Sequence, residues 1–399
     1  MKTAIILFIL CFFLCNEIQA QKQNIIPGQY IVVLKESAAL PVMKRSNRSF
    51  NRIRNADTVY RKQNLAKISE IKKRQNILPS KGLLEFADLV VGFSAKLTSD
   101  EADRLTKDKD VKAVYQDYIV TIGEYKTEKV IKADALVGQT EACSVGLAGG
   151  PGDGSNKYTW IWIFDTGIDL DHPDLNVQVN APYAISFTGE PLDDQNGHGT
   201  HVAGIAAAKN NDFGVVGVSA GAKVVPVKVL TNATGTGDFS WIVGGLNHVA
   251  QYGIPGDVIN MSLGTYSFLP CDGFFPELNT SIINLAKTGI WVVMAAGNDA
   301  SDATFSHPGC LNGDRIFTVG AIDCGNLCAP FSNFGTNVDY VTAGVNILST
   351  YKNGTYAVES GTSMSAPVLA GILHQINNYP VSHNIAYCGG INYKIPSIH

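Results

Sequence analysis

Several features that mark whole classes of protein are missing from this sequence. Beyond residue 20, no stretch approaches the roughly 18 consecutive apolar residues of a membrane-spanning helix, so a membrane-anchored product is not expected. Paired Cys-x-x-Cys spacing is absent, which argues against structural zinc held by thiolates. The formal net charge is only -4, whereas nucleic acid or an anionic membrane as partner calls for a basic surface. What remains is a globular protein, and 399 residues allow two domains.

The first 20 residues have the pattern of a secretory signal peptide. Lys2 precedes an apolar run from Ala4 to Leu14, and Ala20 stands before a polar segment. The apolar run is too short to cross a bilayer. We therefore expect residues 1–20 to be removed and the product to be secreted and extracellular.

The number of cysteines is also consistent with an exported protein. Two of the eight lie in the signal segment, which leaves Cys143, Cys271, Cys310, Cys324, Cys328 and Cys388. An even number in an exported chain predicts three disulfides. Six cysteines permit 15 pairings and the sequence does not choose among them; we favour Cys324 with Cys328 and Cys271 with Cys310, and expect Cys388 to tether the C-terminal tail.

Residues from Gln29 to about Val120 have the pattern of a small α+β unit without cysteines. The expected elements are a strand at Tyr30–Leu34, a polar helix at Asp57–Arg74, a strand at Leu89–Phe93, a helix started by Thr98-Ser99-Asp100-Glu101, and a strand at Val111–Val120. The basic residues between Lys44 and Arg74 are expected to face solvent or an acidic surface elsewhere in the same chain. Because no catalytic constellation occurs here, the unit is expected to fold, bind or inhibit.

Beyond residue 140, short apolar strands alternate with helical stretches. Expected strands are Trp160–Phe164, Lys223–Leu230, Val258–Met261, Ile290–Met294 and Ile316–Val319. Expected helices are His201–Lys209, Ser240–Tyr252, Leu278–Lys287 and Met364–Asn377. Near-continuous apolar strands are typical of a parallel sheet covered on both faces, so we expect an α/β fold with its active site beyond the carboxyl ends of the strands.

Three glycine-rich segments carry residues that suit nucleophilic catalysis. They are Asp165-Thr-Gly-Ile-Asp169, the run from Asn196 to Gly204 that contains His198, and the run from Ser360 to Pro367 that contains Ser363. A serine is a weak nucleophile until an imidazole takes its proton, and the imidazole needs a carboxylate on its other nitrogen. A strand that ends in Ala295-Ala-Gly-Asn298 supplies an amide donor for the developing oxyanion, beside the backbone N–H of Ser363.

In the chain order Asp, His, Ser, these segments resemble the subtilisin family of serine endopeptidases, in particular its proteinase K-like branch. The resemblance implies a three-layer subtilisin-like domain with a mostly parallel sheet, preceded by a small α+β propeptide domain. The implied boundaries are 1–20 for the signal, 21–123 for the inhibitory propeptide and 124–399 for the peptidase domain. It also implies peptide hydrolysis through an acyl-enzyme, by an autoprocessed zymogen.

The resemblance assigns a role to each catalytic residue. Asp165 orients His198, His198 acts as general base and then acid, Ser363 is the nucleophile, and Asn298 donates to the oxyanion. His201, one helical turn after His198, is expected to have a packing role.

Substrate recognition follows from the same resemblance. Two segments are expected to pair with the backbone of an extended substrate: Ser262-Leu263-Gly264 and Gly235-Thr236-Gly237. Leu263, Phe239 and Leu230 would line an apolar pocket for the residue four before the cut, or else belong only to the core. The pocket for the residue at the cut would lie between Ser262–Gly264, Ala295–Gly297 and Ser306–Pro308. No acidic residue is expected to select Arg or Lys there, so we expect broad cleavage with an apolar or aromatic bias.

Structural calcium and a propeptide are also implied. The expected calcium ligands are Asp174, Asn211 and the backbone carbonyls of Lys209, Phe213 and Val215, although the same loop reads as a plain turn. Residues 117–123 would lie in the substrate groove like a product, so that the propeptide inhibits the enzyme and self-cleavage falls within a few residues of Gly123. Partners are then extended protein or peptide substrates and this propeptide, on a monomer.

Two departures and two rival functions bear on this assignment. Val368 stands where the family commonly has histidine, and a glycine-rich insertion at Gly146–Gly154 prevents assignment of the mature N-terminus and of any calcium ligand from it. The rivals are a catalytically silent peptide binder and a carbohydrate hydrolase that uses Asp165 with Asp169 or Asp171. Labelling of serine by a fluorophosphonate separates the endopeptidase from both.

Overall fold

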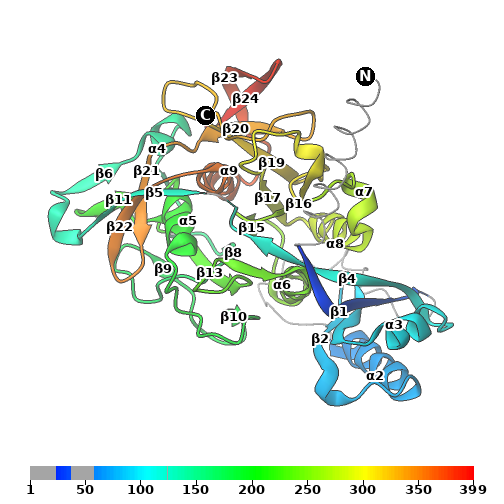
Figure 1. Cartoon of the computed structure of the whole chain (residues 1–399). Helices are drawn as coiled ribbons and strands as arrows, with labels where there is room; N and C mark the ends of the chain where they lie inside the picture. The colour runs from blue at the N-terminus through cyan, green and yellow to red at the C-terminus, as the bar shows by residue number, and fades with distance from the viewer. Residues whose placement is uncertain (1–23, 37–57, 124) are drawn as a thin grey trace, which may run out of the picture.

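The structure is a computed structural model that describes residues 24–36, 58–123 and 125–399. The expected signal segment lies outside these residues. A small N-terminal unit packs against a larger α/β unit (Figure 1). Within the described residues, no helix combines the length and the apolar character needed to cross a membrane.

The N-terminal unit is built on an antiparallel sheet. Its elements are β1 Ile25–Leu34, α2 Thr58–Arg74, η1 Pro79–Lys81, β2 Gly82–Ala87, β3 Val91–Lys96, α3 Ser99–Thr106 and β4 Val111–Thr121. The strand order is β14-β4-β1-β3-β2, in which β14 (Thr236–Asp238) comes from the larger unit. One sheet therefore joins the two units.

The run at Tyr30–Leu34 is apolar throughout because both faces of this sheet are covered. Val32 and Leu34 pack with α2 and α3, whereas Ile31 and Val33 belong to a core shared with the larger unit. Successive side chains of a strand point to opposite faces, so one strand contributes to both cores. The N-terminal unit is thus attached by buried apolar surface, in addition to the shared sheet.

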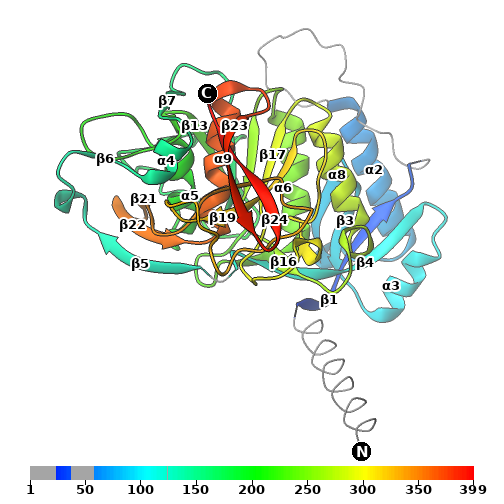
Figure 2. The same cartoon turned by 90° about the horizontal axis from the view of Figure 1, so that it is seen from above.

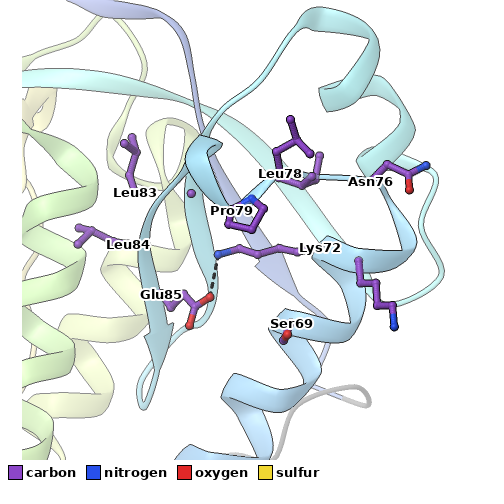
Figure 3. A pocket seen from close by; sticks show the side chains of 11 residues that line it. Ser69, Lys72, Asn76, Leu78, Pro79, Leu83, Leu84 and Glu85 are labelled. Atoms are coloured by element: carbon purple, nitrogen blue, oxygen red, sulfur yellow. Dashed lines mark hydrogen bonds and ion pairs between the residues drawn. The ribbon is translucent and has the colours of Figure 1, made fainter.

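The helices of this unit follow their sequence signals. Thr98 and Glu101 form a capping box at the start of α3. The basic residues of α2 bind acidic residues of the same unit, as in the pair of Arg74 with Asp108 at 2.6 Å. Figure 3 shows a hollow between α2 and β2 where Lys72 contacts Glu85 at 2.8 Å. For the part of the basic stretch that the structure describes, residues 58–74, acidic partners therefore lie within the N-terminal unit itself.

The larger unit is built on a ten-stranded sheet. The strand order is β10-β13-β8-β15-β17-β19-β20-β24-β23, with β9 beside β13. All neighbouring pairs are parallel except the terminal pair of β23 and β24. The fold class expected from the sequence is confirmed.

Helices cover both faces of this sheet. Ile161 and Ile163 of β8 pack in a core with α5 and α9, whereas Trp162 and Phe164 pack in the other core with α6 and α8. Figure 2 shows α6 and α8 on the side of the N-terminal unit. Strands buried on both faces explain the near-continuous apolar runs of the sequence.

The bounds of the larger unit's elements are as follows. The strands are β5 Lys126–Ile131, β6 Gln139–Glu141, β7 Gly152–Asp153, β8 Ile161–Asp165, β9 Asn176–Val177, β10 Ile185–Ser186, β11 Gly214–Val216, β12 Ser219–Ala220, β13 Lys223–Lys228, β15 Val258–Met261, β16 Thr265–Tyr266, β17 Trp291–Ala295, β18 Ser306–His307, β19 Ile316–Ile322, β20 Tyr340–Ala343, β21 Ile347–Tyr351, β22 Thr355–Ser360, β23 Val381–Cys388 and β24 Ile391–Ser397. The helices are η2 Ala133–Ala135, α4 Cys143–Leu147, α5 His198–Ala207, α6 Phe239–Tyr252, α7 Cys271–Phe274, α8 Pro276–Ala286, η3 Ala303–Phe305 and α9 Thr362–Ile376.

Most expected elements differ by one or more residues from the observed bounds, and two of these differences concern the contact with α6 and the start of α5. The strand expected at Leu89–Phe93 begins at Val91, because the side chain of Asn247 on α6 accepts the backbone N–H groups of Asp88 and Leu89 and holds them as a loop. The helix expected at His201–Lys209 is α5, which begins at His198 itself.

Three disulfides join distant parts of the larger unit. They are Cys143–Cys324, Cys271–Cys310 and Cys328–Cys388. The predictions for Cys271–Cys310 and for tethering of the tail by Cys388 are confirmed, but the pair of Cys324 with Cys328 is wrong. These two cysteines flank a tight turn in which the N–H of Asp323 donates to the carbonyl of Leu327, and each bonds to a different segment.

Candidate active site

Asp165 and His198 meet at the carboxyl end of the central sheet. Asp165 is the last residue of β8 and His198 is the first of α5, and both are fully buried. Nδ1 of His198 lies 2.8 Å and 3.0 Å from the two carboxylate oxygens of Asp165. Nε2 of His198 is buried and has no hydrogen-bond partner among the described residues. The imidazole is therefore anchored through one nitrogen and presents the other.

The start of α5 is fixed by a residue that the sequence reasoning missed. The carboxylate of Asp194 accepts the backbone N–H groups of Gly197 at 2.9 Å and of Thr200 at 3.0 Å, so it caps the helix. A Cβ on Gly199 would lie 2.1 Å from the carbonyl oxygen of Gly167, which explains why glycine follows the histidine. The spacing of an aspartate four residues before the histidine was the available signal.

The environment of His198 has opposing effects on its pKa. Burial lowers the pKa, but the charge and hydrogen bond of Asp165 outweigh burial, and the net pKa lies above the ordinary value. This is the balance expected when a buried carboxylate stabilises the imidazolium form.

Ser363 lies in the first turn of α9 and is nearly fully buried. Helices α5 and α9 pack against each other, and Tyr125 links the two helix starts. Its ring lies 4.9 Å from that of His198, and its Cβ lies near Gly361, two residues before Ser363. The hydroxyl of Ser363 donates to the carbonyl of Ser262 at 3.3 Å. The structure thus brings all three candidate catalytic residues to one end of the sheet.

Asn298 follows β17 and is held in one orientation. Its side-chain oxygen accepts from the backbone N–H of Thr362 at 2.9 Å and from the hydroxyl of Thr362 at 2.8 Å. The amide nitrogen of Asn298 lies on the opposite side, 3.7 Å from where a Cβ of Gly123 would be. The amide nitrogen of Asn298 therefore lies beside both helix α9 and Gly123.

The chain before Gly123 occupies a groove between two backbone segments. Thr121 exchanges both backbone hydrogen bonds with Gly264, at 2.9 Å and 2.8 Å, and the N–H of Ile122 donates to the carbonyl of Gly235 at 3.1 Å. On the same side Val120 lies opposite Gly237. Strand β4 thus runs between the two expected segments as far as Thr121, Ile122 is still bonded to Gly235, and Gly123 follows with φ of 72°. Asp117 lies just outside the groove, where its carboxylate accepts the N–H of Ser240 near the start of α6.

A pocket opens beside Gly123. Its lining includes Leu263, Gly264, Ala295, Gly297, Asn298, Asp299, Ser306, Thr362 and Ser363. The three segments expected to form the pocket for the residue at the cut are therefore brought together. Glycine at 123 has no side chain to place in this pocket.

The apolar pocket expected further along the groove is also assembled. Leu230, Phe239 and Leu263 are buried in the same core as Val120. Val120 is the third residue before Gly123 and points its side chain into this core. In the uncut chain Leu230 and Leu263 therefore both belong to the core that receives the side chain of Val120, so the pocket interpretation and the core interpretation both hold.

His201 takes part in packing. Its Nε2 lies 3.1 Å from the carbonyl of Ile347 and 3.0 Å from the carbonyl of Ala357, which places a donated proton there. Burial lowers its pKa. The histidine joins α5 to the β21–β22 hairpin.

The candidate calcium ligands lie together and reveal one residue that was missed. The side-chain amide nitrogen of Gln139 lies 2.9 Å from the carbonyl of Lys209, 3.2 Å from Oδ1 of Asn211 and 3.3 Å from the carbonyl of Val215. Asp174 is fully buried beside them, 2.9 Å from Nδ2 of Asn211. Carboxylate, amide and carbonyl oxygens are the ligands that calcium prefers, so the cluster fits this ion. A flip of the Gln139 side-chain amide exchanges its nitrogen and oxygen, so that Gln139 can present an oxygen to the cluster.

Comparisons with known proteins agree with this geometry. A model of the subtilase family matches residues 156–381, and a model of peptidase inhibitor I9 matches residues 29–123. Subtilisin E of Bacillus subtilis (strain 168) is 36% identical over 317 residues, covering 78% of this chain and 77% of that protein. Subtilisin of Bacillus pumilus is 41% identical over 210 residues, covering 52% and 73%.

A solved structure is also similar. The crystal structure of a cold adapted subtilisin-like serine proteinase matches with a TM-score of 0.53 and 26% identity, over 62% of this chain and 90% of that one. The narrower assignment to a proteinase K-like branch stays a prediction.

Proposed function

This chain belongs to the subtilase family and is a serine endopeptidase, and from that premise we propose that Ser363 cuts the chain's own backbone after Gly123. The observation that carries the proposal is the segment at residues 119–123, which lies in the groove. It is held on both sides by backbone hydrogen bonds and ends beside Asn298 and Ser363. We propose residues 21–123 as an inhibitory propeptide and 124–399 as the peptidase domain, in support of which the I9 model matches residues 29–123 and the subtilase model residues 156–381.

The proposed reaction gives each side chain of the site a role. His198, held by Asp165 through Nδ1, takes the proton of the Ser363 hydroxyl at Nε2, and the Ser363 oxygen attacks the substrate carbonyl. The oxyanion accepts from the amide of Asn298 and the N–H of Ser363. His198 then gives its proton to the leaving amine, the peptide C–N bond breaks, and water hydrolyses the acyl-enzyme by the same route.

Substrate recognition is proposed to be mainly through the backbone. Gly235, Gly237 and Gly264 hold residues 120–122 by their main chain, a mode that accepts any extended peptide. The pocket beside Gly123 contains Ala295, Gly297 and Ser306, with Asp299 at its edge. We propose broad specificity with an apolar or aromatic preference at the residue before the cut.

Calcium is proposed as a structural ion. Asp174, Asn211, Gln139 and the carbonyls of Lys209, Phe213 and Val215 would hold it. The ion would neutralise the buried carboxylate of Asp174, whose pKa is raised by burial, and would fix the loop that joins α5 to β11. It takes no part in the chemistry.

Secretion is proposed from the signal pattern of residues 1–20 and from the three disulfides. Disulfides persist in oxidising compartments, which an exported protein reaches.

The test is covalent labelling. A fluorophosphonate should modify Ser363 in the processed wild-type enzyme, and labelling should abolish hydrolysis of a peptide substrate. Ser363→Ala should neither react nor hydrolyse. Loss of hydrolysis without modification of Ser363, or modification of a different serine, contradicts the proposal. A silent peptide binder would react with nothing.

A further inference from the structure

The chain on the far side of Gly123 also lies on the active site. It forms β5, which pairs antiparallel with β22 from Lys126 opposite Ser360 to Ile131 opposite Tyr356. Strand β22 leads directly to Ser363. The hydroxyl of Thr127 donates to the buried carboxylate of Glu359 at 2.8 Å. Residues 125–131 therefore lie where the residues after the cut in a long substrate would have to bind.

Tyr125 brings this segment onto the catalytic histidine. The ring of Tyr125 meets that of His198 edge to face, with centroids 4.9 Å apart. Burial raises the pKa of the Tyr125 hydroxyl, so the side chain is uncharged. Its ring covers the imidazole of His198. A cut after Gly123 removes none of these contacts.

The other end of the segment is fixed independently of that cut. Strand β6, Gln139–Glu141, pairs in parallel with β11, and Gln139 contacts the candidate calcium loop. After cleavage at Gly123, β5 stays tied to the enzyme through residues 132–138. A short tether gives the tied segment an effective concentration in the millimolar range, so β5 competes with substrate even when its own affinity is weak.

The tether itself is open to proteases. Lys132 to Ala135 are exposed, and Val137 is 99% exposed. Gly138 has φ of 72°, as expected for a chain that turns in solvent. Exposed loop tips of this kind are preferred sites of proteolytic nicking. Leu136 and Val137 also offer the apolar residues that this enzyme is proposed to favour.

Resting on the proposed function, we propose that β5 is a second inhibitory segment, and that a second cut between Lys132 and Gly138 by another copy of the enzyme completes activation. The cut is an ordinary hydrolysis, in which a peptide bond breaks and water supplies the new carboxylate oxygen and the proton of the new amine. It releases residues 124 to the cut, frees the edge of β22 for the leaving side of substrates, and leaves Gln139 in place.

The experiment compares two forms of the enzyme whose first residues are assigned by mass spectrometry. One form begins at residue 124 and is enriched by Ala133→Pro with Val137→Pro, which makes the exposed tether a poor substrate. The other form begins beyond residue 132. Two substrates are used: a peptide nitroanilide, with no residues after the cut, and a peptide with eight residues after the cut.

We expect kcat/KM for the long peptide to be at least tenfold lower for the form that begins at 124, with a smaller difference on the nitroanilide. A second variant, Lys129→Pro with Val130→Pro, should restore cleavage of the long peptide without the second cut. Successive N–H groups of a strand point to opposite sides, so at least one of these prolines removes a donor to β22. Because β5 is an exposed edge strand, the rest of the fold should tolerate the change.

Equal kcat/KM for the long peptide in both forms overturns the inference, as does a lack of effect of the β5 prolines. Failure of the proposed function looks different, because then no form would cleave either substrate once the propeptide has been removed.

Discussion

Ser262 and Ser363 exchange hydrogen bonds across the active site. The hydroxyl of Ser262 donates to the carbonyl of Ser363 at 2.8 Å, and the hydroxyl of Ser363 donates to the carbonyl of Ser262 at 3.3 Å. The segment that follows β15, in which Gly264 pairs with Thr121, is thereby tied to the start of α9. In the uncut chain the hydroxyl of Ser363 donates to this carbonyl, and Nε2 of His198 has no hydrogen-bond partner among the described residues. Hydrogen bonds of this kind commonly tighten only when the reacting complex forms.

Removal of the amide donor of Asn298 should slow the chemical step more than binding. For Asn298→Ala we expect kcat to fall roughly 10²–10³-fold with little change in KM, the size known for the oxyanion asparagine of a subtilisin. Thr362→Val, which removes the hydroxyl that holds the Asn298 oxygen, should cause a smaller fall. Steady-state kinetics on a nitroanilide measures both. An unchanged kcat in Asn298→Ala would assign the oxyanion donor elsewhere.

The acid limb of the pH profile should depend on Asp165. The neutral form of His198 is the base, so kcat/KM falls as the pH drops through the pKa of His198. Because Asp165 raises that pKa, Asp165→Asn should move the acid limb to lower pH, while maximal kcat falls about 10⁴-fold.

Asp169→Asn is the matched control for the pH profile. Asp169 is a buried carboxyl four residues after Asp165 that accepts the N–H of Gly354, and burial raises its pKa to about 6. Its substitution should leave the acid limb in place. Loss of all activity in Asp169→Asn would instead favour a mechanism with paired carboxylates.

Calcium removal should destabilise the enzyme without altering its chemistry. A ligand present at 100 times its Kd stabilises the folded state by about 2.7 kcal/mol, so a chelator should lower Tm by several degrees. Gln139→Ala and Asp174→Asn should each reduce the calcium-dependent shift. Asp212→Asn, an exposed acid of the same loop, is the control that should retain it. Equal Tm values with calcium and with chelator would exclude the site.

Release of the propeptide should be faster at neutral than at acidic pH. Nε2 of Gln29 donates to both Asp117 at 2.9 Å and Asp238 at 2.6 Å, and burial raises the pKa of Asp238 to about 6 against the opposing charge of Lys96. A carboxyl whose pKa is raised in the complex stabilises the complex while protonated, and this stabilisation is lost as the pH rises through about 6.

The variant Asp238→Asn tests this pH dependence. It resembles the protonated form, so at pH 7 activity should appear roughly tenfold more slowly after processing than in wild type. The difference between the two proteins should shrink at pH 5. A variant that activates at the wild-type rate at pH 7 would show that Asp238 does not control release.

The layers of the fold, and the proximity of the candidate catalytic residues, could be predicted from the sequence. Apolar strands buried on both faces leave a strong pattern, and Asp165, His198 and Ser363 each stand at the junction of a regular element with a glycine-rich turn. Parallel strands present their carboxyl ends at one edge, so these residues were bound to lie near one another.

Contacts between segments that are distant along the chain could not be predicted from the sequence. Cys324 lies four residues before Cys328 along the chain but bonds to Cys143, and nothing in the local sequence indicates that pairing. Gln139 was missed because an insertion interrupts the approach to β8, and only the pairing of β6 with β11 shows that it reaches Asn211. Asp194 was overlooked although its spacing before His198 was a signal, because the turn that brings its carboxylate to the N–H groups of Gly197 and Thr200 is seen only in the structure.

The most direct test of the account is mass spectrometry of the purified wild-type and Ser363→Ala precursors after folding in calcium. We predict that wild type splits after Gly123, whereas Ser363→Ala stays whole and folded. Splitting of both proteins at the same bond, or of neither despite correct folding, would contradict the central claim that Ser363 processes its own chain.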